Sequence, residues 1–129
     1  MSASALIIVD MQVGSFTAAT PRHDADGLVA RLNALAGRVR QNSGIVIFVR
    51  HDGPAGDPHY PGLPGWHILP ALEILPADKI MAKTACDSFL GTELEDILTA
   101  REIDELIITG CATDYCVDTT VRSALARGY

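Results

Sequence analysis

The sequence predicts an α/β protein in which an open parallel sheet has helices on both faces, giving three αβα layers. Short runs of branched apolar residues alternate along the chain with segments whose apolar residues recur at helical spacing. The short runs show no polar alternation, which is typical of strands that are buried on both faces. A length of 129 residues is that of one ordinary domain, so we expect a single domain over residues 1–129.

The first half of the chain contains two predicted strands and one helix. "ALIIVDM" from Ala5 is a continuous apolar run that ends in a carboxylate, which indicates a strand. The segment from Asp24 to Asn42 has apolar residues at helical spacing and is followed by a glycine stop, so it predicts a helix. "GIVIFVR" from Gly44 is a second buried strand. The Gly- and Pro-rich segment 53–64 is expected to be an extended loop, and such long loops are commonly functional.

The second half repeats the alternation of strand and helix. "KIMAK" at 79–83 predicts a short third strand, and Thr92 and Glu95 stand at capping-box spacing, so a helix is expected to begin there. "DELIITG" at 104–110 is a fourth strand. "VDTTVRSALARG" at 117–128 carries apolar residues at helical spacing and predicts the last helix.

Composition excludes several classes of partner. The net charge is −6, and no basic stripe is present that could neutralise phosphates, so we expect no nucleic acid and no membrane as partner. A small-molecule substrate is the expected ligand. The 48% apolar content indicates a surface partly covered by a sister subunit, which predicts a homo-oligomer. An odd number of cysteines and the absence of a secretion signal predict a reduced, cytoplasmic protein.

Three polar residues fall at the carboxyl ends of predicted strands, where parallel sheets place their sites. Asp10 follows the first strand, Lys83 ends the third, and Cys116 stands at the start of the helix after the fourth. Each alone has a structural interpretation: a turn aspartate, a surface lysine and a small core residue. Their convergence on one edge of the sheet favours a catalytic site.

The position of Cys116 predicts a reactive thiol. The pKa of a thiol falls beside a cation and at a helix N-terminus, which Lys83 and the last helix would supply. Thr113 or Asp114 is the expected N-cap of that helix.

Asp10 and the backbone would complete the chemistry. A carboxylate in reach of the thiol can take its proton and later donate it to a leaving amine, so Asp10 is the expected general base and then acid. The N–H groups of Ala112 and Cys116, on the turn between strand and helix, are the expected oxyanion site.

Other interpretations of the cysteines and histidines stay open at this point. Cys111 ends a buried strand and is expected to be a packing residue, and a redox pair of Cys111 and Cys116 is disfavoured because its C-x4-C spacing is not C-x-x-C. Cys86 has no predicted role. Asp57 and His59 could hold a divalent cation with a further histidine, but the spacing is not a specific signature, so we expect no metal and no cofactor.

Residues just beyond the strand ends and in the long loop are the candidates for contacting a substrate. Trp66 is interpreted as either a core residue or a lid over the site, because exposing an indole ring to water costs free energy. The full set of expected substrate-binding residues is Gln12, Phe16, His51, Trp66, Phe89 and Tyr115.

The surroundings of these residues resemble the isochorismatase-like cysteine hydrolases. The matching stretches are "LIIVDMQ", "GIVIFVRHD", "GWHILPAL", "KTACDSFLGTELEDIL" and "LIITGCATDYCVDTTVRSALARGY", which together span nearly the whole chain. The resemblance implies a Rossmann-like sheet of strand order 3-2-1-4 and a triad of Asp10, Lys83 and Cys116. It also implies a cis peptide between Cys111 and Ala112 that turns the Ala112 N–H into the oxyanion site.

The resemblance also indicates an activity. A cysteine nucleophile favours hydrolysis of a C–N bond over vinyl-ether cleavage, so we expect an amidohydrolase that acts on a small amide or carbamoyl compound through a thioester. A vinyl-ether hydrolase and a non-catalytic metabolite-binding or scaffold homologue are the alternatives. Nicotinamidases of this family place D-x-H directly after the second strand, where this chain has "RHDG", so their metal-dependent activity is not expected.

Members of that family usually continue past the "GY" at 128–129 into a further strand and helix. We therefore expect further strands beyond residue 129 and an exposed fourth strand, whose apolar side chains lack cover.

Overall fold

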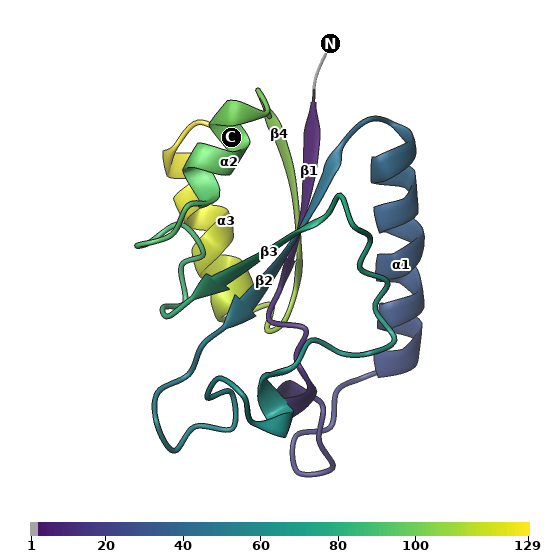
Figure 1. The fold of residues 1–129 in the computed structure, drawn as a ribbon, viewed down its shortest axis with the longest axis vertical. Coiled ribbons are helices and arrows are strands. Elements are labelled where there is room, and N and C mark those ends of the chain that lie inside the picture. Colours follow the sequence, from purple (N-terminus) through teal and green to yellow (C-terminus); the bar gives the residue numbers. More distant parts are fainter. Residues whose placement is uncertain (1–2) are drawn as a thin grey trace.

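The computed structural model describes residues 3–129, which contain a four-stranded parallel sheet of order β3-β2-β1-β4 (Figure 1). Both the predicted fold class and the predicted strand order are confirmed. Each strand begins within one residue of the apolar run that predicted it, because such runs are the part of a fold that local sequence specifies best. The strands are β1 (Ser4–Val9), β2 (Ile45–His51), β3 (Lys79–Lys83) and β4 (Glu105–Gly110).

Helices cover both faces of the sheet. Helix α1 (Ala25–Gln41) packs on one face, while α2 (Leu94–Ala100) and α3 (Cys116–Ala126) pack on the other (Figure 1). Alternate residues of the central strand β1 belong to the two resulting cores, and every β1 residue from Ala5 to Val9 is buried. The three-layer arrangement explains why the strands lack polar alternation.

The start of α2 differs from the prediction. The helix begins at Leu94 after an N-cap at Glu93, and no capping box forms with Thr92. The Thr92 hydroxyl donates a 2.6 Å hydrogen bond to the Ser88 carbonyl and accepts the Leu94 N–H at 3.3 Å, whereas Glu95 accepts from Arg127 at 3.0 Å and does not complete the box. Helix α1, in contrast, is flanked by Asp24 and Asn42 as the sequence predicts.

Strand β4 is an edge of the described sheet. It pairs with β1 on one side, and no strand within residues 3–129 pairs with its other side. Its apolar side chains are only half-buried. A shallow apolar groove of about 170 Å³ lies between β4 and α3 and is lined by Leu106, Ile108, Val121, Ala124, Leu125 and Tyr129.

Strand register brings the carboxyl ends of all four strands to one edge. Val9 is aligned with Gly110 on one side and with Val49 on the other, and His51 is aligned with Lys83. The segments that follow these strands therefore meet in space. The 52–78 loop also returns to this edge, since Gln12 forms an isolated antiparallel bridge with Ile68.

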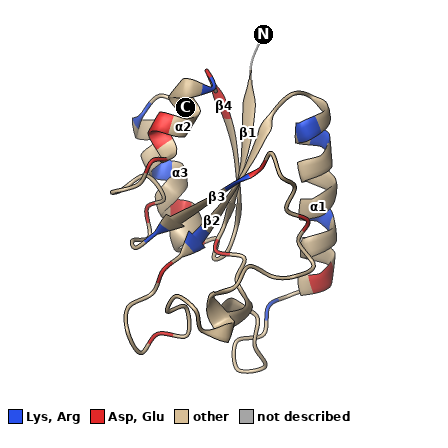
Figure 2. Cartoon of the chain, in the orientation of Figure 1, with Lys and Arg blue, Asp and Glu red and all other residues tan. Residues whose placement is uncertain are grey.

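Charged residues are interspersed over the helices and loops (Figure 2). None of the helices within residues 3–129 has the length and apolar character needed to cross a bilayer.

Candidate active site

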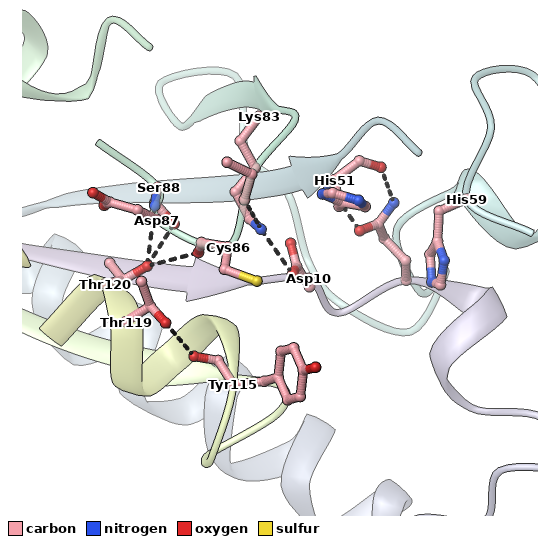
Figure 3. Close-up of polar contacts among 12 residues, drawn as sticks. Asp10, His51, His59, Lys83, Cys86, Asp87, Ser88, Tyr115, Thr119 and Thr120 are labelled. Atoms are coloured by element: carbon pink, nitrogen blue, oxygen red, sulfur yellow. Dashed lines mark hydrogen bonds and ion pairs between the residues drawn. The ribbon is translucent and has the colours of Figure 1, made fainter. Parts of the chain in front are cut away.

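A buried ion pair lies at the carboxyl edge of the sheet. Lys83 Nζ is 3.1 Å from Asp10 Oδ2, and their side chains are 0% and 10% exposed (Figure 3). Lys83 Nζ also donates a 2.7 Å hydrogen bond to the Ala85 carbonyl. Asp10 has a φ of 53°, a left-handed conformation that aspartate tolerates better than most residues. This turn of the backbone ends β1, while the Asp10 N–H still bonds to the Val49 carbonyl on β2 at 2.9 Å.

The other carboxylate oxygen is available for chemistry. Asp10 Oδ1 is buried and has no hydrogen-bond partner within the described residues. Figure 3 shows that the side chains of Lys83 and Cys86 both point toward the Asp10 carboxylate. A carboxylate held by a cation on one oxygen and free on the other is arranged to accept a proton.

Cys116 is the first residue of α3 and lies beside this ion pair, but its pKa moves in the opposite direction from the one predicted. Burial raises the pKa of the Cys116 thiol to about 12, the Asp10 carboxylate adds to the rise, and Lys83 opposes it. The prediction of a lowered pKa is wrong because it counted the cation and the helix start but not burial or the nearby anion. The Cys116 side chain is therefore a neutral thiol, and reaction through its sulfur would require removal of the proton.

The turn before α3 presents free backbone donors. The N–H groups of Ala112 and Cys116 make no hydrogen bond within residues 3–129, and the Cys111–Ala112 peptide bond is cis. The predicted N-cap at Thr113 or Asp114 is wrong: the N-cap is Tyr115, and no side chain caps the helix. The turn is instead closed by the Ala112 carbonyl, which accepts the N–H groups of Tyr115 and Val117 at 3.1 and 3.2 Å.

A buried hydroxyl pair that the sequence reasoning missed joins the β3 turn to α3. Ser88 Oγ lies 3.0 Å from Thr120 Oγ1, and the Ser88 N–H donates to the same oxygen at 3.2 Å (Figure 3). Thr120 also donates to the Cys86 carbonyl at 3.4 Å. Thr120 is one helical turn after Cys116, so this spacing was the available signal. The contact fixes the turn carrying Cys86 against the helix carrying Cys116.

Gln12 is fully buried and serves the backbone. Its Nε2 donates to the carbonyls of His51 and Trp66 at 2.9 and 2.8 Å, and its Oε1 accepts the His51 N–H at 2.9 Å. All of these partners are main-chain atoms of the β2 end and the long loop. The geometry therefore assigns Gln12 to positioning these segments, and its contact with a substrate stays a prediction.

The aromatic candidates are spread over different parts of the molecule. Phe89 is buried in the core under α2 and α3, where Arg127 covers its ring at 4.7 Å. Tyr115 is 66% exposed at the start of α3. Phe16 borders a cavity of about 290 Å³ on the α1 side of the 110–114 turn, whose lining also includes Arg22, His23, Leu28, Cys111 and Ala112. The structure thus brings Phe16 close to the turn and leaves Phe89 in the interior.

Trp66 is half-buried, and its contacts fix it within the long loop. Its Nε1 donates a 2.7 Å hydrogen bond to Asp52, the Arg50 guanidinium covers its ring at 3.9 Å, and the His67 ring packs edge-on against it. None of these partners belongs to the Asp10, Lys83 and Cys116 group, so its role as a lid stays a prediction.

The histidine and aspartate residues of the loop bind one another. Asp57 Oδ1 accepts the His59 N–H at 2.7 Å, which lowers the pKa of Asp57, and lies 3.0 Å from His59 Nδ1. His59 Nε2 is 3.0 Å from Ser15 Oγ, so both ring nitrogens have protein neighbours. Among residues 3–129, no three His, Cys, Asp or Glu side chains form a group that could hold a metal ion.

Comparison with known proteins agrees with this arrangement. A family model described as an isochorismatase domain matches residues 4–129. A streptothricin hydrolase of Streptomyces noursei is 33% identical over 125 residues, which cover 97% of this chain and 50% of that protein. A ureidoacrylate amidohydrolase of Variovorax paradoxus is 28% identical over 99% of this chain and 65% of its own length.

A solved structure is similar over nearly the whole chain. The N-carbamoylsarcosine amidase of Thermoplasma acidophilum superposes with a TM-score of 0.89 at 26% identity, covering 98% of this chain and 78% of that one. The chain spans about half the length of the streptothricin hydrolase that it matches and 78% of the length of the amidase.

Proposed function

The chain belongs to the isochorismatase family of hydrolases, and on that premise we propose that it hydrolyses a C–N bond in a small amide or carbamoyl compound through a thioester on Cys116. The observation that carries the proposal is the buried Lys83–Asp10 pair beside a thiol at the start of α3. The names of three similar proteins support this proposal. Two of them, the ureidoacrylate amidohydrolase and the N-carbamoylsarcosine amidase, are named as enzymes that hydrolyse amide bonds, and the third is named a streptothricin hydrolase. The Cys116 thiol favours this chemistry over vinyl-ether cleavage.

The first half of the proposed reaction forms the thioester. Asp10 Oδ1 takes the thiol proton while Cys116 Sγ attacks the substrate carbonyl, so the raised pKa of the thiol is overcome in the same step as attack. The N–H groups of Ala112 and Cys116 receive the negative charge that develops on the carbonyl oxygen. Asp10 then donates its proton to the leaving nitrogen, and ammonia or an amine departs.

The second half reverses the proton path with water. Asp10 removes a proton from water as the water oxygen attacks the thioester, and it returns that proton to the Cys116 sulfur. Lys83 remains 3.1 Å from Asp10 Oδ2 and offsets its negative charge at the start of each half of the reaction. The scheme uses only residues of this chain and consumes one water per amide bond.

The decisive experiment is a screen of small primary amides and carbamoyl compounds with ammonia release as the readout, run with and without chelator. Wild type is expected to release ammonia, and Cys116→Ala to release none while folding normally. Cys111→Ala serves as the matched thiol control and should retain activity, because the Cys111 side chain packs in the core on the α1 side of the sheet. Ammonia release by Cys116→Ala at the wild-type rate would refute the proposal, as would loss of all activity on chelation.

We extend the proposal to the setting of the protein. All three cysteines are free, which supports a reducing compartment such as the cytoplasm. The 48% apolar composition supports self-association into a homo-oligomer.

A further inference from the structure

Three side chains outside the Cys116 site are joined by hydrogen bonds and form the Ser15 cluster, which consists of Ser15, Asp57 and His59. His59 Nδ1 lies 3.0 Å from Asp57 Oδ1, and His59 Nε2 lies 3.0 Å from Ser15 Oγ. The imidazole thus joins a carboxylate to a hydroxyl, which is the connectivity of a serine, histidine and aspartate triad. No hydrogen bond or ion pair within residues 3–129 joins these three side chains to the Lys83–Asp10 pair.

The main chain holds the Ser15 cluster in place. Ser15 is the last residue of a short 3₁₀ helix, η1 (Val13–Ser15), which follows β1. The long loop is closed beside it by a 3.0 Å hydrogen bond from the Gly53 N–H to the His59 carbonyl. Gly14 lets the imidazole approach η1 closely, because a Cβ at this position would lie 3.1 Å from His59 Nε2.

Asp57 sets the protonation of the cluster. The main-chain N–H of His59 donates to Asp57 Oδ1 at 2.7 Å and lowers the pKa of Asp57, so the carboxylate is anionic and can only accept hydrogen bonds. His59 Nδ1 must therefore carry a proton, and Nε2 of the neutral imidazole has a lone pair. The Ser15 hydroxyl then donates to Nε2, which is the arrangement that a general base needs.

The Ser15 hydroxyl can be reached from solvent. Ser15 is partly exposed, and the side chains of His59 and Asp57 are 21% and 35% exposed. Arg22 Nε donates a 2.9 Å hydrogen bond to the Ser15 carbonyl, so a positive charge lies beside the hydroxyl. This charge favours the negative charge that develops on a carbonyl oxygen during attack.

We propose that the Ser15 cluster is a second hydrolytic site, which cleaves short-chain carboxylic esters with Ser15 as nucleophile and His59 as general base. Ser15 Oγ bonds to the ester carbonyl carbon as its proton passes to His59 Nε2, and the alcohol leaves with that proton. Water then attacks the acyl-serine while His59 takes its proton, and the acid departs as the proton returns to Ser15 Oγ. An ester is the expected substrate because an alcohol leaves more readily than an amine, which suits a site that is open to solvent.

The Cys116→Ala variant isolates this activity, because the Ser15 cluster does not include Cys116. We expect it to hydrolyse p-nitrophenyl acetate, and we expect Ser15→Ala or His59→Leu, each added to it, to lower the rate at least about a hundredfold. Ser43→Gly and His67→Leu, at an exposed serine and an exposed histidine outside the cluster, are the controls and should keep the rate. A full rate in the variant that lacks Ser15 would overturn the inference, because a histidine would then act alone.

Labelling identifies the nucleophile without altering the cluster, and it decides the question if the added substitutions prevent folding. Diisopropyl fluorophosphate should phosphorylate Ser15 of the Cys116→Ala variant, with formation of an O–P bond as fluoride leaves, and peptide mass spectrometry locates the adduct. The absence of an adduct on Ser15 would overturn the inference. Neither measurement depends on ammonia release, so the second site and the proposed function are tested separately.

Discussion

Replacing Lys83 by methionine tests whether the ion pair is buried as described. Methionine keeps an unbranched apolar side chain but removes the ammonium, which leaves the Asp10 carboxylate, 10% exposed, without its cation at 3.1 Å. Breaking a buried pair by removing one partner costs about 3–5 kcal/mol. Since a domain of this size is stable by only about 5–15 kcal/mol, this is a large part of its free energy of unfolding.

Urea unfolding measures the effect. The fluorescence of Trp66, the single tryptophan, reports the transition. With a urea dependence of about 1–3 kcal/mol per molar, the midpoint should fall by on the order of 1–5 M. Lys79→Met, at the exposed start of the same strand, is the matched control and should change the stability by no more than about 0.5 kcal/mol.

A double variant separates charge from packing. Adding Asp10→Asn to Lys83→Met removes the unpaired carboxylate, so most of the lost stability should return while amide hydrolysis stays absent. The reasoning is refuted if Lys83→Met unfolds at the same urea concentration as Lys79→Met, because the carboxylate would then be solvated.

Three further predictions concern other parts of the molecule. Gly110→Ala should lower the free energy of unfolding measured in urea by several kcal/mol, because its φ is +120° and an added Cβ would collide with the Val9 carbonyl oxygen on β1. Wild-type stability of this variant would contradict the close packing of Gly110 against β1. Arg40→Met should lower the free energy of unfolding by about 1.5–3 kcal/mol, because it removes the 2.6 Å contact with the Asp78 carboxylate, which is 3% exposed. Arg31→Met, in an exposed pair with Asp24, should lower it by less than about 0.5 kcal/mol. Equal losses in the two variants would argue against burial of the Arg40–Asp78 pair. The rate at which iodoacetamide alkylates Cys116 should rise with a midpoint well above pH 9, because the raised pKa keeps the thiol protonated below that pH. Asp10→Asn should move this midpoint to lower pH, since it removes the carboxylate that raises the pKa. An unchanged midpoint would show that Asp10 does not raise the pKa of Cys116.

Local sequence determined the elements and the edge on which the site lies. The apolar runs predicted all four strands, and polar residues at their ends placed Asp10, Lys83 and Cys116 at one edge. This worked because buried strands need uninterrupted apolar residues, and because parallel strands end together.

The sequence could not predict how the polar atoms at that edge are used. The amide of Gln12 binds main-chain atoms of two distant segments, Phe89 lies in the core, and the Thr92 hydroxyl serves the turn before α2. Each of these outcomes depends on a partner far away in the chain or on a choice between competing hydrogen bonds.

The direction of the Cys116 pKa shift shows most clearly what the sequence determines and what depends on the tertiary structure. Sequence supplied the cation and the helix start, which lower a thiol pKa, and tertiary structure supplied the burial and the Asp10 carboxylate, which raise it to about 12. The sequence thus determined the fold and the edge of the sheet at which Asp10, Lys83 and Cys116 lie. Only the tertiary structure decided the protonation of the Cys116 thiol, because desolvation and charge proximity depend on how distant segments pack together.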